Sequence, residues 1–149
     1  AAASCAYQAT LTANQGSRFV CRWVHLIPEE SSTCVFTRYL SAPIDCPVAH
    51  GEGRVVLSDP SQLRALEDAG HITFRYAGQS ENGQSRRDPN PNGSIGDIAG
   101  LCNTQGNVMG MMPHPENHIY SWQQPNRGSR PWMSGLPLFE AAIRYAKTL

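Results

Sequence analysis

The sequence lacks a long apolar run, a closely spaced cysteine pair and a surplus of charge of either sign. No apolar stretch approaches the roughly 18 residues that a bilayer-spanning helix needs, so the sequence predicts no membrane partner. Twelve basic and twelve acidic side chains give a formal net charge of +0. Because binding to a phosphate backbone requires a cationic excess, this balance argues against nucleic acid as a main partner.

The cysteines are few and scattered. An odd count, wide spacing and the absence of a Cys-x-x-Cys motif argue against a disulfide framework and against a zinc knuckle. Four of the five lie in or beside apolar, strand-like runs and are predicted to be free, buried thiols: Cys21, Cys34, Cys46 and Cys102. Free thiols are typical of a reducing compartment, and we expect a cytoplasmic protein.

The remaining composition, with 40% hydrophobic and 16% charged residues, is typical of a globular chain, and 149 residues suit a single domain. Runs rich in β-branched and aromatic residues predict strands at 18–26, 33–40, 44–50, 54–57 and 72–76, and a hairpin across 98–112. A helix is predicted after Ser58-Asp59-Pro60, ending at Gly70. Two helices for about six strands indicate the second half of an α/β domain.

The last helix is predicted over 136–149, and polar loops are predicted at 78–93 and 118–134. The helix has an amphipathic pattern. One apolar stripe is expected to hold Leu138, Phe139, Ala142, Ile143 and Ala146.

Two short segments place an imidazole and a carboxylate two residues apart, His50-Gly51-Glu52 and His114-Pro115-Glu116. In an extended backbone, residues i and i+2 project to the same side. A histidine held by a carboxylate can serve as the general base beside a serine or cysteine nucleophile. Local spacing alone does not favour one segment over the other.

Longer strings give the second segment a context. The ordered motifs are Asn14, Arg18-Phe19, Cys21-Arg22-Trp23-Val24, Pro47-Val48-Ala49-His50-Gly51-Glu52-Gly53-Arg54, Asn90-Pro91-Asn92-Gly93-Ser94, Ile98-Ala99-Gly100, Gly106-Asn107-Val108-Met109-Gly110-Met111-Met112-Pro113-His114-Pro115-Glu116 and Gly135-Leu136-Pro137-Leu138-Phe139-Glu140. Over residues 14–149 the chain resembles the glutaminase subunits of phosphoribosylformylglycinamidine synthases, which are class I glutamine amidotransferases.

The resemblance implies a flavodoxin-like, three-layer α/β domain with a mixed sheet, filling 1–149 and incomplete at its N-terminus, with 1–13 a divergent or frayed start. It implies a Cys-His-Glu triad that hydrolyses glutamine to glutamate and ammonia. His114 and Glu116 fall on the catalytic motif, and His50 and Glu52 on a motif near the bound glutamine.

The resemblance also implies partners. Ammonia would pass to a synthetase subunit or domain of the same enzyme, which uses ATP and magnesium to amidate formylglycinamide ribonucleotide in purine biosynthesis. A small accessory subunit is a further expected partner. The resemblance implies no cofactor and no metal bound by this domain itself.

Two departures from the family pattern stand out. Asn117 follows Glu116 where the family usually has arginine. The family nucleophile lies in a Gly-x-Cys-Asn-Gly turn between a strand and a helix, whereas Cys5 lies in Ala-Ser-Cys-Ala-Tyr without glycine. The nucleophile is therefore not found in this chain. Two hypotheses remain: part of an enzyme whose nucleophile lies upstream, or a non-catalytic amidotransferase-like module that binds a synthetase partner.

Two weaker readings concern the segment around the second histidine–carboxylate pair. His114 and His118 flank a carboxylate, but proline stands where a zinc-binding helix would carry glutamate, and no third ligand is evident. Trp122 and Trp132 lie in a stretch rich in proline and glycine. That stretch is either a surface for docking a partner or an ordered loop.

Overall fold

The computed structural model describes residues 9–78, 80–81, 84–85, 89–125 and 132–149. The strands are β1 (Ala9–Thr12), β2 (Val20–Pro28), β3 (Ile44–His50), β4 (Arg54–Leu57), β5 (Ile72–Ala77), β6 (Ser80–Glu81), β7 (Gln84–Ser85), β8 (Ile98–Cys102) and β9 (Met109–Met111). The α-helices are α1 (Gln62–Asp68) and α2 (Leu136–Ala146), and the 3-10 helices are η1 (Ile95–Asp97), η2 (Pro115–His118) and η3 (Ser121–Gln123).

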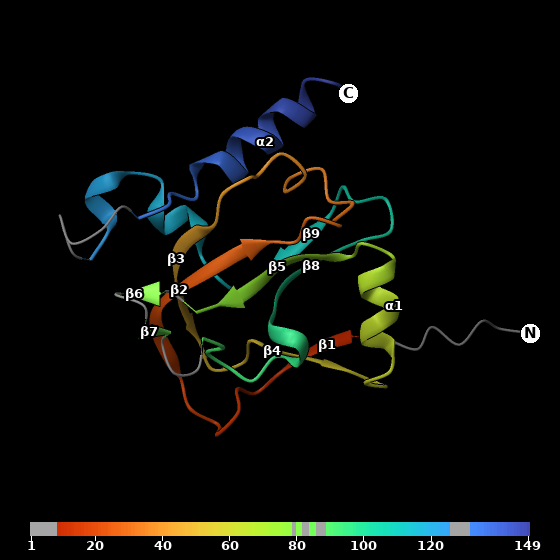
Figure 1. Ribbon diagram of the computed structural model, residues 1–149, viewed down its shortest axis with the longest axis vertical. Coiled ribbons are helices and arrows are strands. Elements are labelled where there is room, and N and C mark those ends of the chain that lie inside the picture. The colour runs from red at the N-terminus through yellow and green to blue at the C-terminus, as the bar shows by residue number, and fades with distance from the viewer. Residues whose placement is uncertain (1–8, 79, 82–83, 86–88, 126–131) are drawn as a thin grey trace, which may run out of the picture.

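A curled five-stranded sheet in the order β3-β2-β5-β8-β9 forms the centre of the chain (Figure 1). The two pairs β1-β4 and β6-β7 form separate small sheets. The sequence predicts the α/β class correctly. Every pairing between the described strands is antiparallel, however, and not mixed as expected. Two neighbouring parallel strands need a connecting segment of a dozen or more residues. The segment between β8 and β9 is shorter than that, so these strands are antiparallel.

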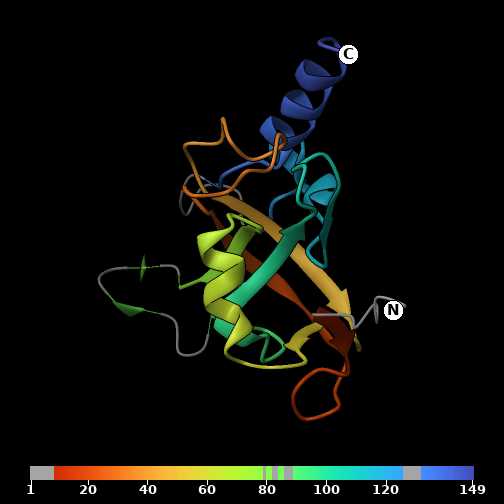
Figure 2. The same cartoon turned by 90° about the vertical axis from the view of Figure 1, so that its right-hand side faces the viewer.

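Apolar side chains cover both faces of the central sheet. Ile98 and Ala99 are neighbours in β8 and therefore point to opposite faces. Ile98 packs with Val55, Ile72 and the α1 residues Leu63 and Leu66. Ala99 belongs to the larger cluster, which contains Val24, Leu26, Ile44, Cys46, Val48, Phe74, Tyr76 and, from α2, Leu138. Figure 2 shows α1 in front of the sheet and α2 beyond its end, so helices cover both clusters.

The strand predicted at 33–40 is wrong, because this segment is a series of turns. The amides of Thr37 and Arg38 both donate to the carbonyl of Cys34, at 3.2 and 3.0 Å. Cys34 and Val35 are buried. The apolar residues of this segment are therefore explained by their burial and not by an extended strand. Gly106 lies against this turn with a φ of +70°, and a Cβ there would stand 2.3 Å from the carbonyl oxygen of Thr33.

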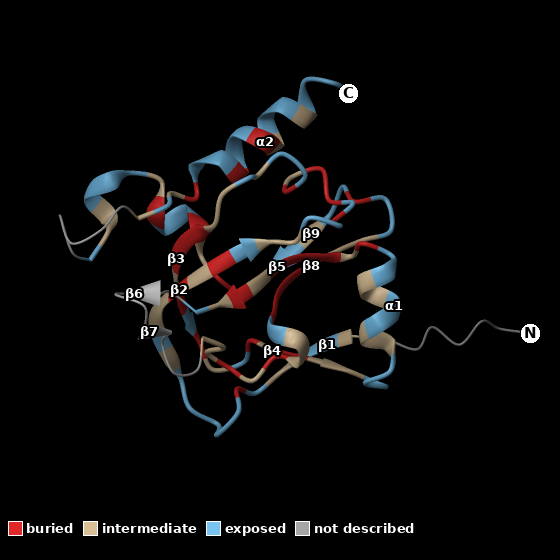
Figure 3. Cartoon of the chain, viewed as in Figure 1, coloured by how far each residue is buried: buried red, intermediate tan, exposed pale blue. Residues whose placement is uncertain are grey.

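Helix α2 does not have the single apolar stripe expected from its sequence. Its buried residues are Leu138 and Ala141, whereas Phe139 and Ile143 are 36% and 57% exposed. At 100° per residue, Phe139 and Ile143 project well away from the direction of Leu138. Figure 3 shows how little of this helix is buried. Among the described residues, no helix has the length and hydropathy to cross a bilayer.

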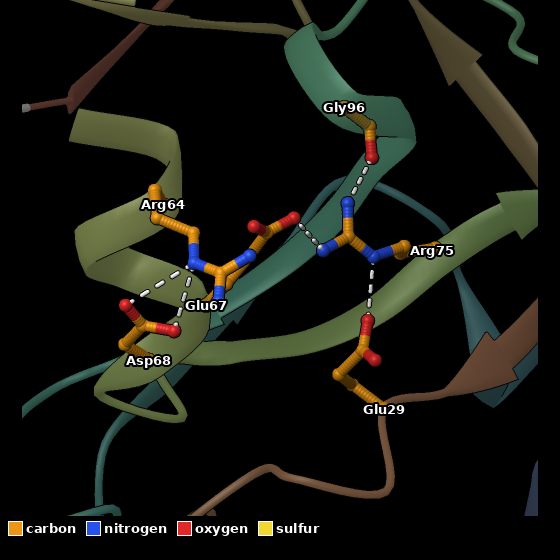
Figure 4. Close-up of polar contacts among 6 residues, drawn as sticks. All are labelled: Glu29, Arg64, Glu67, Asp68, Arg75 and Gly96. Carbon is orange, nitrogen blue, oxygen red and sulfur yellow. Dashed lines mark hydrogen bonds and ion pairs between the residues drawn. The ribbon is translucent and has the colours of Figure 1, made fainter. Parts of the chain in front are cut away.

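Arg75 of β5 connects three parts of the fold (Figure 4). Its Nε donates to Glu29 Oε2 at 2.5 Å and its Nη2 donates to Glu67 Oε1 of α1 at 2.9 Å. Its Nη1 donates to the carbonyl of Gly96 in η1. One guanidinium thus ties the end of β2, helix α1 and the turn before β8 together, using the fork of donors that lysine lacks.

Part of the segment expected to be a divergent or frayed start is a strand. Ala9–Thr12 pairs with β4 in the antiparallel register Ala9↔Leu57 to Thr12↔Arg54. Residues 1–8, and Cys5 with them, lie outside the described residues. The strand shows that Ala9–Thr12 is not frayed, and the divergent start stays a prediction.

Candidate functional site

His114 and Glu116 contact each other beside the free edge of β3. His114 Nδ1 lies 2.7 Å from Glu116 Oε1, and the His114 amide donates to the carbonyl of Pro47 at 2.9 Å. The sequence predicts an extended backbone over 114–116. Instead, Pro115 begins the 3-10 helix η2, with His114 as its N-cap at φ −109° and ψ 78°. The helical turn brings the carboxylate back towards the ring.

The hydrogen-bond partner decides which nitrogen of His114 is available. A carboxylate can only accept, so Nδ1 carries the proton that points to Glu116. The neutral ring then presents Nε2 as an unprotonated acceptor. Both side chains are open to solvent, at 40% and 54% exposure. An oriented imidazole with a free Nε2 is the arrangement that activates a neighbouring thiol or hydroxyl.

Among the described residues, no cysteine is hydrogen-bonded to this imidazole ring. Cys34 and Cys46 are buried as predicted, Cys102 is half-buried, and Cys21 is exposed, so the prediction is wrong for Cys21. Cys46 directly precedes Pro47, whose carbonyl accepts from the His114 amide. Burial above all, and then the charges of Asp45 and Glu116, raise the pKa of the Cys46 thiol far above its usual value. Cys46 therefore serves as a core residue in this state.

The first candidate segment, His50-Gly51-Glu52, is arranged differently. His50 Nδ1 lies 3.0 Å from Asn14 Oδ1, and Glu52 is exposed at the turn. Asn14 Nδ2 donates to the carbonyls of Arg18 and His50, at 2.9 and 2.8 Å. Because these bonds fix the amide orientation, Asn14 Oδ1 must accept and His50 Nδ1 must donate.

The His50 ring lies flat against the backbone of the following turn. A Cβ on Gly53 would stand 2.4 to 2.6 Å from three ring atoms, so only glycine fits there. The amide of Gly53 also donates to Asn14 Oδ1 at 3.1 Å. His50 Nε2 is buried and has no hydrogen-bond partner among the described residues. Asn14, His50 and Gly53 therefore form one buried unit, held by hydrogen bonds that adjacent sequence positions do not reveal.

A third motif joins this unit. Asn92 Nδ2 donates to the carbonyl of Gly53 at 2.7 Å, and Ser94 Oγ donates to Asn92 Oδ1 at 2.7 Å. The amide of Val55 in turn donates to Ser94 Oγ at 3.0 Å. Three motifs far apart in the sequence thus meet in one hydrogen-bonded network, in which the buried side-chain amides of Asn14 and Asn92 are paired inside the protein.

The buried state of His50 predicts a pH dependence of stability. Burial lowers the pKa of His50, and the nearby His114 lowers it further, although the backbone around His50 acts in the opposite direction. The unfolded chain therefore binds a proton more readily than the folded one. This stability is fully present above the unfolded pKa of about 6.5 and is lost as the pH falls below it.

We expect the free energy of unfolding, measured by urea titration, to fall between pH 7 and pH 5 in the natural chain. His50→Gln should flatten this dependence. A His71→Gln variant, changed at a partly exposed histidine, is the matched control and should keep the natural slope. Equal slopes in the natural chain and in His50→Gln would contradict the prediction.

Metal binding finds no support in the geometry. Among the described residues, no group of three or more histidine, cysteine, aspartate or glutamate side chains is placed to hold a metal ion. His118 is 1% exposed, and its Nδ1 donates to the carbonyl of Asp45 at 2.6 Å. The zinc alternative for His114 and His118 is therefore not supported.

The two tryptophans have different surroundings. Trp132 packs edge-on against Trp23, with ring centroids 5.0 Å apart. Trp122 is 61% exposed and stacks on Tyr120 at 4.4 Å. Residues 126–131 of this stretch lie outside the described residues, so both alternatives for it stay predictions.

Sequence reasoning missed a second histidine–carboxylate pair. His25 Nδ1 donates to Asp45 Oδ1 at 2.8 Å, across the pairing of β2 with β3. Asp45 is 0% exposed. A signal was present, because an aspartate inside the apolar run Ile44-Asp45-Cys46-Pro47-Val48 must find donors when it is buried. The sequence does not show which donors these are.

Comparisons with known proteins agree with the motifs. A family model for the CobB/CobQ-like glutamine amidotransferase domain matches residues 2–146. Phosphoribosylformylglycinamidine synthase subunit PurQ of Treponema denticola is 47% identical over 118 residues, which cover 75% of this chain and 43% of that protein. The PurQ subunit of Bartonella henselae is 41% identical over 140 residues, covering 93% of this chain and 55% of that protein.

The fold also matches a solved structure. A chain in the structure of PurLQS from Thermotoga maritima superposes with a TM-score of 0.67 at 30% identity, covering 93% of this chain and 53% of that chain. The chain thus spans about half the length of the curated relatives it matches.

Proposed function

Because this chain belongs to the family of CobB/CobQ-like glutamine amidotransferase domains, we propose that it supplies the histidine–glutamate part of a glutaminase centre. In this proposal the whole enzyme hydrolyses glutamine to glutamate and ammonia, and the ammonia amidates formylglycinamide ribonucleotide. The observation that carries the proposal is the 2.7 Å contact between His114 and Glu116, which orients the ring and leaves Nε2 free at an accessible edge.

The chemistry assigns each group a role. A cysteine thiolate attacks the side-chain carbonyl carbon of glutamine, and His114 Nε2 has accepted the thiol proton. The carbon–nitrogen bond then breaks, and His114 returns the proton to the departing ammonia, which leaves a thioester. Water, deprotonated by His114, hydrolyses the thioester to glutamate and restores the thiol. Glu116 holds the ring orientation throughout.

The nucleophile is the part that this chain does not offer among its described cysteines. We propose that it lies on a segment outside these 149 residues. Cys5 lies outside the described residues, and its sequence context lacks the glycines of a nucleophile elbow. The centre would then be completed only when that segment docks beside His114.

The first motif has a supporting role in this proposal. His50 is buried and shapes the turn at Gly51 and Gly53, while exposed Glu52 offers a carboxylate to the α-ammonium group of glutamine. Strand β3 links the two motifs, because it ends at His50 and because the carbonyl of its Pro47 accepts from the His114 amide at 2.9 Å. The turn and the dyad would thus frame one substrate site.

A synthetase is the proposed partner. The matched Thermotoga maritima chain belongs to a structure of PurLQS, and we propose that this chain likewise acts with a synthetase subunit or domain and a small accessory subunit. ATP and magnesium would be used by the synthetase and not by this domain. A cytoplasmic location fits the free thiols and the biosynthetic role.

A non-catalytic module that only binds a synthetase is the second candidate. The absence of a thiolate beside His114 among the described residues favours it. The two candidates differ in what happens when a nucleophile is supplied. A chimera that joins this chain to the part of the Treponema denticola relative that it does not match would supply one in the family context.

The test is glutaminase activity of that chimera. We expect it to release ammonia and glutamate from L-glutamine in equal amounts, and not to release ammonia from L-asparagine, whose amide lies one methylene closer to the backbone. A folded chimera that binds the synthetase yet releases no ammonia would favour the non-catalytic module instead.

A further inference from the structure

Strand β3 lies at one edge of the central sheet, because among the described strands it pairs only with β2. Unpaired edge groups are normally covered or protected. Here the segment that carries the dyad covers them. The His114 amide donates to the carbonyl of Pro47, and His118 Nδ1 donates to the carbonyl of Asp45. Pro47 has no amide hydrogen to satisfy, which suits an edge position.

Asp45 makes polar contacts at this edge through both its backbone and its side chain. Its backbone amide donates to the carbonyl of Met133 at 2.8 Å, and its backbone carbonyl accepts from His118 at 2.6 Å. Its Oδ1 accepts from His25 at 2.8 Å, and its Oδ2 accepts from the amide of Met133 at 2.9 Å. A fully buried carboxylate is stable only with such donors, so the aspartate and its partners hold each other in place.

His118 joins η2 to Trp23 and to the residues just before α2. The ring of His118 meets Trp23 edge-on, with centroids 5.2 Å apart. The carbonyl of His118 accepts from the amide of Gly135 at 2.7 Å and from Ser134 Oγ at 3.0 Å. A Cβ on Gly135 would stand 2.6 Å from the carbonyl oxygen of Pro115, so this chain crossing is tight. The 3-10 turn between His114 and His118 is therefore fixed at both ends.

We propose that His118 and Asp45 are positioning residues for the dyad of His114 and Glu116. This role rests on the proposed function. The buried anchor at His118 fixes the far end of η2, and the bond from His114 to Pro47 fixes the near end. Glu116, which lies between these two ends, therefore stays within 2.7 Å of His114 Nδ1. His118 itself touches no reacting atom, because it is buried behind the turn.

His118 directly follows Asn117 and is an internal hydrogen-bond donor. An aromatic residue without a donor would keep the contact with Trp23 but would remove the hydrogen bond to the carbonyl of Asp45. An asparagine would keep a donor close to the place of Nδ1. These two variants separate hydrogen bonding from packing.

The test uses the full 149-residue chain. In His118→Phe we expect the amide of His114 to exchange with solvent about tenfold faster, as loss of one buried hydrogen bond implies. In His118→Asn the exchange should return close to the natural rate. The amide of Tyr76, in the central strand β5, is the control and should be unchanged in both. Nitrogen-15 spectra should show His114 Nδ1 protonated in the natural chain and in His118→Asn, and a mixture of tautomers in His118→Phe.

An unchanged His114 exchange rate in His118→Phe, or an equal rise in both variants, would overturn the proposal. The first result would show that His118 does not hold the His114 amide in place. The second would show that packing of the imidazole ring, and not its hydrogen bond, holds it. In an active chimera, His118→Phe should lower kcat by about tenfold with KM unchanged, and His118→Asn should restore it. If the chimera proves inactive, the proposed function fails, whereas the exchange and tautomer measurements still decide whether His118 positions His114.

Discussion

Replacing His114 by alanine is expected to lower the kcat of an active chimera by about 10⁴-fold or more, because the imidazole both takes the thiol proton and returns it to ammonia. The structure supports this role by the contact of His114 Nδ1 with Glu116, which leaves Nε2 as the base. Ammonia release from L-glutamine, followed with a coupled glutamate assay, gives kcat and KM separately.

The matched control is His50→Ala. His50 is buried and hydrogen-bonded to Asn14 in the turn proposed to bind glutamine, so its removal should mainly raise KM. Glu116→Gln should lower kcat less than His114→Ala, because a neutral amide can still accept from Nδ1. Equal losses of kcat in His114→Ala and His50→Ala would contradict the assignment of His114 as the general base.

The unmodified 149-residue chain is expected to release no ammonia from glutamine above background, at least about 10⁴-fold below an active chimera, since a dyad without a thiolate forms no thioester. Cys46, next to the Pro47 carbonyl that accepts from His114, is fully buried, and that burial raises its pKa. The expected result is therefore the same for the natural chain and for Cys46→Ala.

A glutamine-mimicking chloroketone offers an independent measurement. It should label each cysteine of the natural chain no faster than it labels exposed Cys21, and L-glutamine should give no protection. Rapid, glutamine-sensitive labelling of Cys5 would show that the triad is complete within these residues. Labelling of the chimera at its added cysteine, abolished by excess glutamine, is the positive control.

Several elements of the fold could be predicted from local sequence alone. The β-rich run around Trp23, the helix before Gly70 and the hairpin around Gly106 all appear close to their expected bounds. Each depends on periodicity or on turn residues within a few positions of one another, and such patterns specify local backbone conformation directly. The contact between His114 and Glu116 could also be predicted, because their motif is contiguous.

Other features depend on contacts between distant residues. The run at 33–40 has apolar residues suited to a strand, yet Val35 meets the turn at Gly106 and the backbone curls. Phe139 and Ile143 share an apolar character with Leu138, yet the helix presents only one side to the sheet. In both cases apolar residues are necessary for burial but do not say which neighbour buries them.

The sequence by itself determined the family motifs, most strands and the identity of the dyad, because these are written in residues close together along the chain. Only the tertiary structure decided that Asn14 sets the tautomer of His50 and that Asp45 anchors His118 at the edge of β3. A buried polar group must be paired, but its partner can come from any part of the chain. The partners here lie 36 and 73 positions apart, beyond the reach of any local pattern.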